Sequence, residues 1–263
     1  MKAYPSRRLV VGALAGAPLS ANLVTSARAQ EIDRLEVGRP LERFDLLKPG
    51  VRTWLRSREK DGVHVATDIW RRETRFEDVD GVRRLRIVQR WDGTGATPSL
   101  VERDSVFEMQ TFRPLTHLRV TTTGAGVRTV EGFGFAPDGI TGLDGVADNS
   151  RAGFSIASSE PMYNFETDME MLQTLPWAAG HAVSIPFYHP GGGAPARYVW
   201  RAASDEIVVG PDGAGIPCWI IETDYNAASA PPARFWLAKS TQQLLRMEHR
   251  APDGVLHRKT LLY

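Results

Sequence analysis

The dipeptide Asp-Gly occurs seven times in this 263-residue chain. Glycine, and to a lesser degree aspartate, tolerates the positive φ angles that tight hairpin turns require. The runs between these dipeptides are rich in Val, Ile, Thr, Trp and Arg, and in residues 82–91 the basic side chains sit mainly at even spacing. This pattern predicts antiparallel strands joined by hairpins, with one solvated and one buried face. The dipeptides are Asp61-Gly62, Asp80-Gly81, Asp92-Gly93, Asp138-Gly139, Asp144-Gly145, Asp212-Gly213 and Asp253-Gly254.

The predicted strands extend over nearly the whole chain after residue 50. No internal repeat of fixed period is visible, which argues against a propeller or a solenoid. The strands are expected at residues 51–59, 63–71, 82–91, 99–110, 115–123, 127–135, 181–189, 196–202, 206–210, 218–225, 234–238, 244–250 and 255–262.

One segment, residues 161–175, departs from the strand pattern. Met162, Phe165, Met169 and Leu172 recur at helical spacing, Ser158 or Ser159 can cap the start, and Pro176 can end the helix. We therefore expect one amphipathic helix here. Its methionine-rich stripe suits an adaptable binding pocket, but ordinary packing on a sheet is favoured.

The first 29 residues have the features of a cleavable signal peptide. Lys2, Arg7 and Arg8 form a basic start, residues 9–19 are apolar but too short to span a bilayer, and Ala27-Arg28-Ala29 fits the cleavage pattern. The paired arginines favour the twin-arginine export route over an ordinary Sec signal. The mature chain, residues 30–263, is expected to be a single β-rich domain in the periplasm or secreted, without a stable membrane span.

Charge and cysteine content restrict the mature chain further. Cleavage at Ala29 removes four basic and no acidic residues, changing the formal charge from +1 to −3. Without a long basic run, this balance argues against nucleic acid as a partner. Cys218 is the only cysteine, so no internal disulfide can form, and its apolar neighbours predict a buried, inert thiol.

The motifs of common enzyme classes are missing. The chain contains no H-E-x-x-H, C-x-x-C, Walker or G-x-G-x-x-G sequence, and Ser155 lacks the second glycine of a nucleophile elbow. His181 and His189 lie at opposite ends of one predicted strand, roughly 25 Å apart, so no metal site is expected. No cofactor is expected either. Asp104 and His117 could face each other across a hairpin as an acid–base pair, although a structural hydrogen bond is favoured over catalysis.

The aromatic residues give the best indication of a binding role. Most tryptophans lie in or beside predicted strands, and a strongly curved sheet can turn some of them toward an apolar cavity. The expected apolar lining is Phe165, Met169, Leu172, Trp177, Trp219 and Trp236.

The order of several short motifs resembles a group of exported bacterial proteins defined only as a domain of unknown function. These motifs are Asp104-Ser105, residues 111–117 (TFRPLTH), Leu175-Pro176, Phe235-Trp236-Leu237 and Leu244-Leu245-Arg246. That group is similar to the LolA/LolB lipoprotein carriers. The resemblance implies a single antiparallel, strongly curved sheet, a half-barrel, with one or two helices packed on its concave side. It supplies no individual acyl-binding residue, and the chain lacks the lipobox cysteine of LolB.

Three functions remain in competition. The first is a non-catalytic periplasmic binding or carrier protein for a lipid or another apolar ligand. The second is an envelope assembly or scaffold protein that holds another envelope protein and has no small-molecule cavity. The third is a hydrolase-like enzyme that uses Asp104 and His117, which requires both side chains to converge in one cleft.

Overall fold

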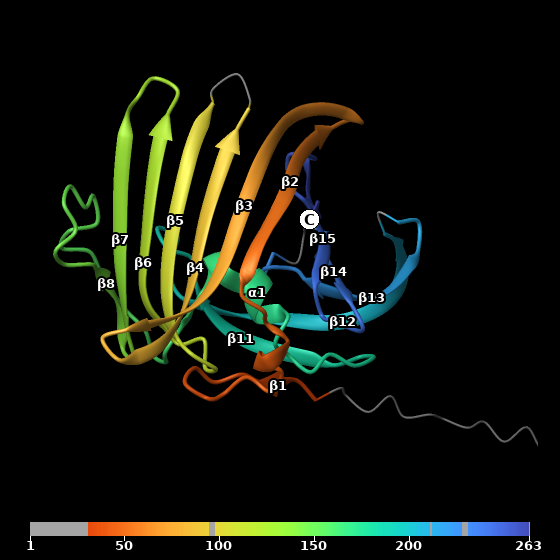
Figure 1. The fold of residues 1–263 in the computed structure, drawn as a ribbon, viewed down its shortest axis with the longest axis horizontal. Coiled ribbons are helices and arrows are strands. Elements are labelled where there is room, and N and C mark those ends of the chain that lie inside the picture. Colours follow the sequence, from red (N-terminus) through yellow and green to blue (C-terminus); the bar gives the residue numbers. More distant parts are fainter. Residues whose placement is uncertain (1–30, 95–97, 211, 228–230, 263) are drawn as a thin grey trace, which may run out of the picture.

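In the part of the chain that the structure describes, one large, curved and unclosed β-sheet wraps around a single short helix (Figure 1). This computed structural model describes residues 31–94, 98–210, 212–227 and 231–262, so the predicted signal peptide lies outside the described residues. The single open sheet confirms the expected mainly β, half-barrel architecture. The strands are β1 (Asp33–Arg34), β2 (Gly50–Lys60), β3 (Val63–Val79), β4 (Val82–Gly93), β5 (Ser99–Glu108), β6 (Pro114–Thr123), β7 (Arg128–Ala136), β8 (Gly139–Gly142), β9 (Ser155–Ala157), β10 (Tyr163–Asn164), β11 (Ala182–Tyr188), β12 (Ala196–Val209), β13 (Gly215–Thr223), β14 (Ala233–Ala238), β15 (Leu244–Arg250) and β16 (Leu256–Leu261).

The sheet consists of two antiparallel runs joined by one long-range pairing. Strands β2 to β9 neighbour each other in chain order, and so do β11 to β16. The last strand, β16, pairs with β2, with Leu261 opposite Trp54, and this pairing makes the two runs one sheet. The sheet path ends at β1 and β9, and β10 pairs with β11 in parallel.

The Asp-Gly turns work as expected at the tall hairpins. Asp61 and Gly62 have φ angles of 50° and 77°, and Asp80 and Gly81 have 51° and 76°. Two consecutive positive angles define the turn whose twist matches that of the flanking strands. Asp92-Gly93 instead ends β4, and Gly139 begins β8. The two strands expected at residues 196–202 and 206–210 are one strand, β12, with a bulge between Ala202 and Ser204.

The helix expected over residues 161–175 is much shorter than predicted. Tyr163 and Asn164 pair with β11, and this pairing requires extended backbone. A 3₁₀ turn, η2 (Phe165–Thr167), and a five-residue helix, α1 (Asp168–Leu172), follow. The Asn164 side chain caps η2 by accepting a hydrogen bond from Glu166 N at 3.0 Å. A second 3₁₀ turn, η1 (Phe44–Leu46), precedes β2.

The main core fills the concave side of the sheet around α1. All five residues of α1 are buried, and Met169, Met171 and Leu172 are at most 1 % exposed. This helix packs against side chains from both runs of strands, including Trp70 on β3 and Phe235 on β14. A smaller cluster, Cys218, Ile220 and Trp236, lies on the opposite face of β13 and β14. No helix in the described part of the chain is long and apolar enough to cross a membrane.

Candidate functional site

A buried ion pair holds α1 against the sheet. Arg72 on β3 donates from Nε to Glu170 Oε1 at 2.7 Å and from Nη2 to Oε2. The two side chains are only 3 % and 7 % exposed. Such a bidentate pair fixes both distance and orientation, so the acidic turn of α1 has one position on the concave face.

Gln89 on β4 completes this attachment. Its Oε1 accepts hydrogen bonds from Arg72 Nη1 at 3.1 Å, Trp91 Nε1 at 3.2 Å and Trp70 Nε1 at 3.3 Å. Its Nε2 donates to the backbone oxygen of Glu166 at 2.8 Å. One buried amide therefore orients both indole rings and the start of η2, and its polar atoms are paired as burial requires.

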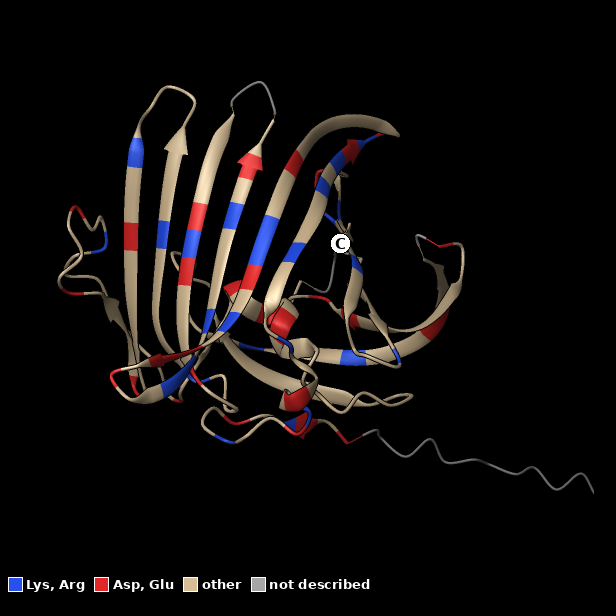
Figure 2. Ribbon diagram, in the orientation of Figure 1, with Lys and Arg blue, Asp and Glu red and all other residues tan. Residues whose placement is uncertain are grey.

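The two oriented indoles are surrounded by cations. Arg103 and Arg56 place their guanidinium carbons 4.0 and 4.8 Å from the ring centre of Trp91. Lys259 Nζ lies 4.7 Å from the ring centre of Trp70. Cations over an aromatic face are attracted by its quadrupole, more strongly when water is excluded. We call Arg56, Arg103 and Lys259, with these two rings, the cation cluster. Figure 2 shows Lys and Arg bands on the strands beside α1 and Asp and Glu bands on α1 itself.

The carboxylates near the cation cluster are unequally charged. Burial by itself raises the pKa of Glu166, but Arg103, His117 and Arg119 hold it below the usual range. Burial raises the pKa of Asp168 to about 6, opposed by Lys259 and Arg72. Burial likewise lowers the pKa of Lys259 to about 8. Shifts of this kind accompany functional sites, although structural ion networks produce them too.

Half-buried aromatic and imidazole rings form a continuous belt beside the cation cluster. Ring centres are 6.2 Å apart for His257 and His249, 5.8 Å for His249 and Tyr225, and 5.5 Å for Tyr225 and Phe165. The ring of Phe165 stacks on His189 at 3.6 Å. Burial lowers the pKa of all three histidines. The belt is therefore a strip of packed rings whose histidines are held toward their neutral form.

The proposed pair of Asp104 and His117 is not formed. Ser105, not Asp104, lies opposite His117 in the β5–β6 register, and Ser105 Oγ is 2.8 Å from His117 Nδ1. Asp104 lies on the other face, where its carboxylate pairs with Arg86 at 2.7 Å. Adjacent residues of a strand point to opposite faces, so the two side chains cannot meet. This corrects the acid–base hypothesis and removes the catalytic function that depended on it.

The predicted apolar lining is distributed between the core and the two faces of the sheet. Met169, Leu172 and Trp177 are at most 2 % exposed and belong to the main core. Phe165, which lies in the belt, is half-buried. Trp219 is half-buried at the margin of the core, with Lys239 Nζ 3.9 Å from its ring centre. Trp236 faces away from α1 and donates to Glu206 Oε2 at 3.1 Å. The six residues therefore do not surround one common space.

A large cavity lies on the opposite face of the sheet from α1. It has a volume of about 660 Å³ between the end of the β12–β13 hairpin and strands β15 and β16. We call it the reverse-face groove; its lining includes Val208, Ile216, Leu245, Leu261, Arg246 and Arg258. Val208 and Ile216 face each other in the β12–β13 register, and both pack against the smaller core cluster with Leu245.

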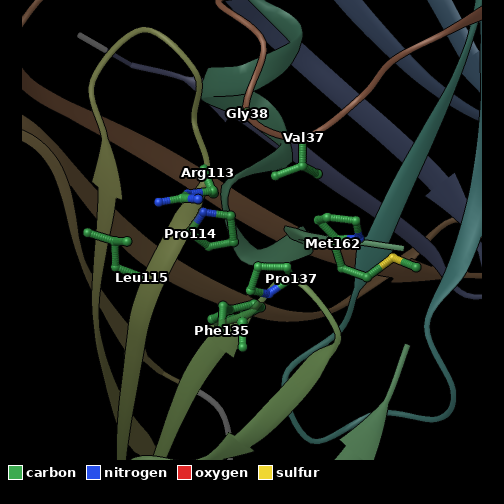
Figure 3. Close-up of a pocket in the computed structure, with 10 residues that line it drawn as sticks. Val37, Gly38, Arg113, Pro114, Leu115, Phe135, Pro137 and Met162 are labelled. Atoms are coloured by element: carbon green, nitrogen blue, oxygen red, sulfur yellow. The ribbon is translucent and has the colours of Figure 1, made fainter. Parts of the chain in front are cut away.

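A second cavity, of about 310 Å³, lies where β6 begins and β7 ends (Figure 3). Val37, Pro114, Phe135, Pro137 and Met162 line it, and Arg113 lies at its margin. None of the six predicted lining residues contributes to either cavity. Within the described ranges, no group of three or more His, Cys, Asp or Glu side chains is placed to hold a metal ion.

Sequence reasoning missed both the cation cluster and the reverse-face groove. The alternating basic residues of β4 correctly indicate a solvated face. Nothing in the sequence shows that Arg56 and Lys259 lie opposite each other in the β16–β2 pairing, or that Arg103 on β5 shares their face of the sheet. The groove could have been sought from the apolar residues on both faces of residues 216–221, since a strand with two apolar faces needs cover on both.

Comparisons with known proteins agree with this architecture. A crystal structure of a β-barrel-like protein from Brucella abortus, a domain of unknown function called DUF1849, superimposes with a TM-score of 0.52 at 8 % sequence identity. The match covers 82 % of this chain and 96 % of that one, and at this identity it shows the fold alone. Among curated proteins, no match was found. The DUF3108 family, described as a protein of unknown function, matches residues 52–259, and the chain therefore belongs to that family.

Proposed function

We propose that this protein is a non-catalytic binding or carrier protein that holds a lipid or another apolar ligand in the reverse-face groove. The observation that carries the proposal is a cavity of about 660 Å³ with a largely aliphatic lining. Binding sites for small ligands have volumes of this order, with mostly apolar walls and a few polar groups. After cleavage of the predicted signal peptide, the protein would act in the periplasm or outside the cell.

The driving force in such a groove is the removal of apolar surface from water. Val208, Ile216 and Leu245 offer aliphatic surface on this face, and ligand burial on it is worth about 25 cal/mol per Å² before ordering costs. The exchange needs no covalent step and no metal ion, which suits a carrier that must also release its ligand.

The polar end of the groove favours a ligand without a strong negative charge. Arg246 lies 3.4 Å from Glu206, and Arg258 lies 2.8 Å from Glu248 and 3.1 Å from Glu59. These carboxylates already neutralise both guanidinium groups. An uncharged polar group, such as a hydroxyl or an ester, can still accept a hydrogen bond there.

The resemblance to the LolA/LolB carriers supports the same class of function, since those half-barrels enclose apolar ligands. The location differs: the space beside α1 is occupied by Met169, Leu172 and Trp177, whereas the groove lies on the other face. A scaffold role remains the alternative. The terminal strands β1 and β9 of the open sheet have two and three residues, so either edge offers little backbone to a partner strand.

The groove can be tested by filling it. Val208→Trp combined with Ile216→Trp places two indoles in the cavity and should abolish binding of a fluorescent lipid probe such as parinaric acid. Val65→Trp is the matched control, because Val65 is 53 % exposed on β3 and remote from the groove. Native mass spectrometry of protein purified from cells should show an extractable apolar ligand on the wild type. Consistently empty protein that also fails to bind the probe would leave the scaffold role as the better explanation.

A further inference from the structure

In the cation cluster on the concave face, Arg56 and Arg103 each share a carboxylate partner with a second arginine, and Lys259 has no carboxylate within ion-pair distance among the described residues. Glu170 is committed to Arg72, and Asp68 is shared between Arg56 at 3.4 Å and Arg58 at 3.9 Å. Glu166 is shared between Arg103 at 3.2 Å and Arg119 at 3.3 Å.

Several donors of the cluster also lack hydrogen-bond partners. Arg103 is 91 % buried as a side chain, since only 9 % of it is exposed, yet its Nη1 makes no hydrogen bond within the described residues. Its Nε lies 3.2 Å from Glu166 Oε2, in an ion pair without hydrogen-bond geometry. Arg56 Nε likewise makes no hydrogen bond within the described residues. A buried donor without a partner costs about 1–3 kcal/mol, and more when it is charged. The arrangement is thus costly as it stands and would be relieved by an added acceptor.

Accessibility is sufficient for a small group to approach. The Arg56 side chain is 24 % exposed, and Trp91 and Lys259 are half-buried on the same face. Trp70 and Trp91, whose ring centres lie 4.7 Å apart, form a rigid floor because Gln89 holds both indole nitrogens. The cations that surround this floor therefore have little freedom to turn away toward solvent.

We propose that Arg56, Arg103 and Lys259, grouped around the indoles of Trp70 and Trp91, bind an oxyanion, a carboxylate or phosphate group, on the concave face. Oxyanions accept several charge-assisted hydrogen bonds at once, which matches guanidinium and ammonium donors that lack acceptors. The site is separate from the reverse-face groove, whose arginines are already neutralised. It requires no covalent step and gives the protein a second ligand of opposite chemical character.

A bound oxyanion would also change the charge state of its surroundings. Burial raises the pKa of Asp168 to about 6 even though Lys259 and Arg72 oppose this shift. Burial lowers the pKa of Lys259; Asp168 and Glu166 oppose this shift, whereas the neighbouring Arg56 and Arg72 add to it. A bound oxyanion would stabilise the charged ammonium and reverse that repulsion.

Trace acylation of lysines provides a direct test with inorganic phosphate as the probe. In the full chain at low ionic strength, phosphate should protect Lys259 from acylation in a saturable manner, read by peptide mass spectrometry. Exposed Lys60 is the internal control and should react equally with and without phosphate. Absence of protection at Lys259, or equal protection at Lys60, would overturn the proposal.

Variants assign the binding to the cluster. Lys259→Gln and Arg103→Gln should each weaken phosphate binding in calorimetry by about tenfold, equivalent to about 1.4 kcal/mol. Arg90→Gln, on the outer face and 49 % exposed, should bind as the wild type does. If Arg103→Gln fails to fold, Lys259→Gln still decides the question, and wild-type affinity in a folded Lys259→Gln variant would refute the site.

The source of the oxyanion is distinguished by comparing octyl phosphate with inorganic phosphate. Much tighter binding of octyl phosphate, protecting Lys259, identifies a lipid headgroup, and equal affinity identifies a free anion. The Val208→Trp/Ile216→Trp variant should retain phosphate binding, so failure of the groove and failure of the oxyanion site give different results.

Discussion

Arg72 on β3 and Glu170 on α1 form a bidentate ion pair that is almost closed to solvent, with side chains 3 % and 7 % exposed. This contact joins residues 98 positions apart in the chain and holds the helix inside the curve of the sheet.

Removing one partner of this pair should be strongly destabilising. Glu170→Gln leaves the Arg72 guanidinium buried without its counter-charge, and we expect a loss of about 3–5 kcal/mol in the free energy of unfolding, measured in urea. The double variant Arg72→Met/Glu170→Leu should recover much of that loss, because it leaves no unpaired buried charge. Arg90→Gln, which breaks the exposed pair with Asp92, should change stability by less than about 1 kcal/mol. Equal effects of the buried and exposed changes would contradict this assignment.

His117 should make the fold sensitive to acid. Burial lowers its pKa from 6.5 to about 4, so between these values the unfolded chain binds the proton more tightly than the native one. Neutral His117 contributes fully to the free energy of unfolding above pH 6.5. This contribution, up to about 3 kcal/mol, is lost as the pH falls toward 4.

Urea unfolding at several pH values checks this prediction. His117→Gln should flatten the dependence between pH 6.5 and 4, whereas His64→Gln, at an exposed position, should leave it unchanged. An unaltered slope in the His117→Gln variant would mean that other groups cause the acid sensitivity.

Gly142 at the end of β8 should tolerate no side chain. A Cβ there would lie 1.9 Å from the backbone oxygen of Arg151 and 2.8 Å from its carbonyl carbon. Because the backbone cannot move aside as the end of a side chain can, Gly142→Ala should lower the free energy of unfolding by about 1–3 kcal/mol. Gly193→Ala is the control, since a Cβ at Gly193 meets nothing within 4 Å. Thermal melting of both variants separates a local clash from a general effect of replacing glycine.

Export should depend on the paired arginines near the start of the chain. We expect Arg7→Lys/Arg8→Lys to block export if the twin-arginine route is used, because that route reads the arginine pair itself. Cell fractionation measures the exported fraction, and sequencing of the mature N-terminus should show Gln30 first. Undiminished export of the double variant would assign the protein to the Sec route.

Local sequence determined most strands and the tight turns between them. Alternation in residues 82–91 and the consecutive positive φ angles at Asp61-Gly62 and Asp80-Gly81 are properties of neighbouring residues, so they can be recognised without knowledge of the fold. The burial of Cys218 follows in the same way from its apolar neighbours, and the thiol is fully buried. The bulge at Ala202 broke the alternation, and one strand was therefore predicted as two.

Tertiary structure decided which distant residues meet. Whether Asp104 or Ser105 lies opposite His117 depends on the register of two strands, and a shift of one residue moves every side chain to the other face. The helical spacing of residues 162–172 was real, but pairing of Tyr163 and Asn164 with β11 left only Asp168–Leu172 for α1. The pairing of β16 with β2 brings Lys259 beside Arg56 and so creates the cation cluster. Periodicity in the sequence encodes how a strand alternates, whereas the partner, the register and the curvature of the sheet are set by packing of the whole chain.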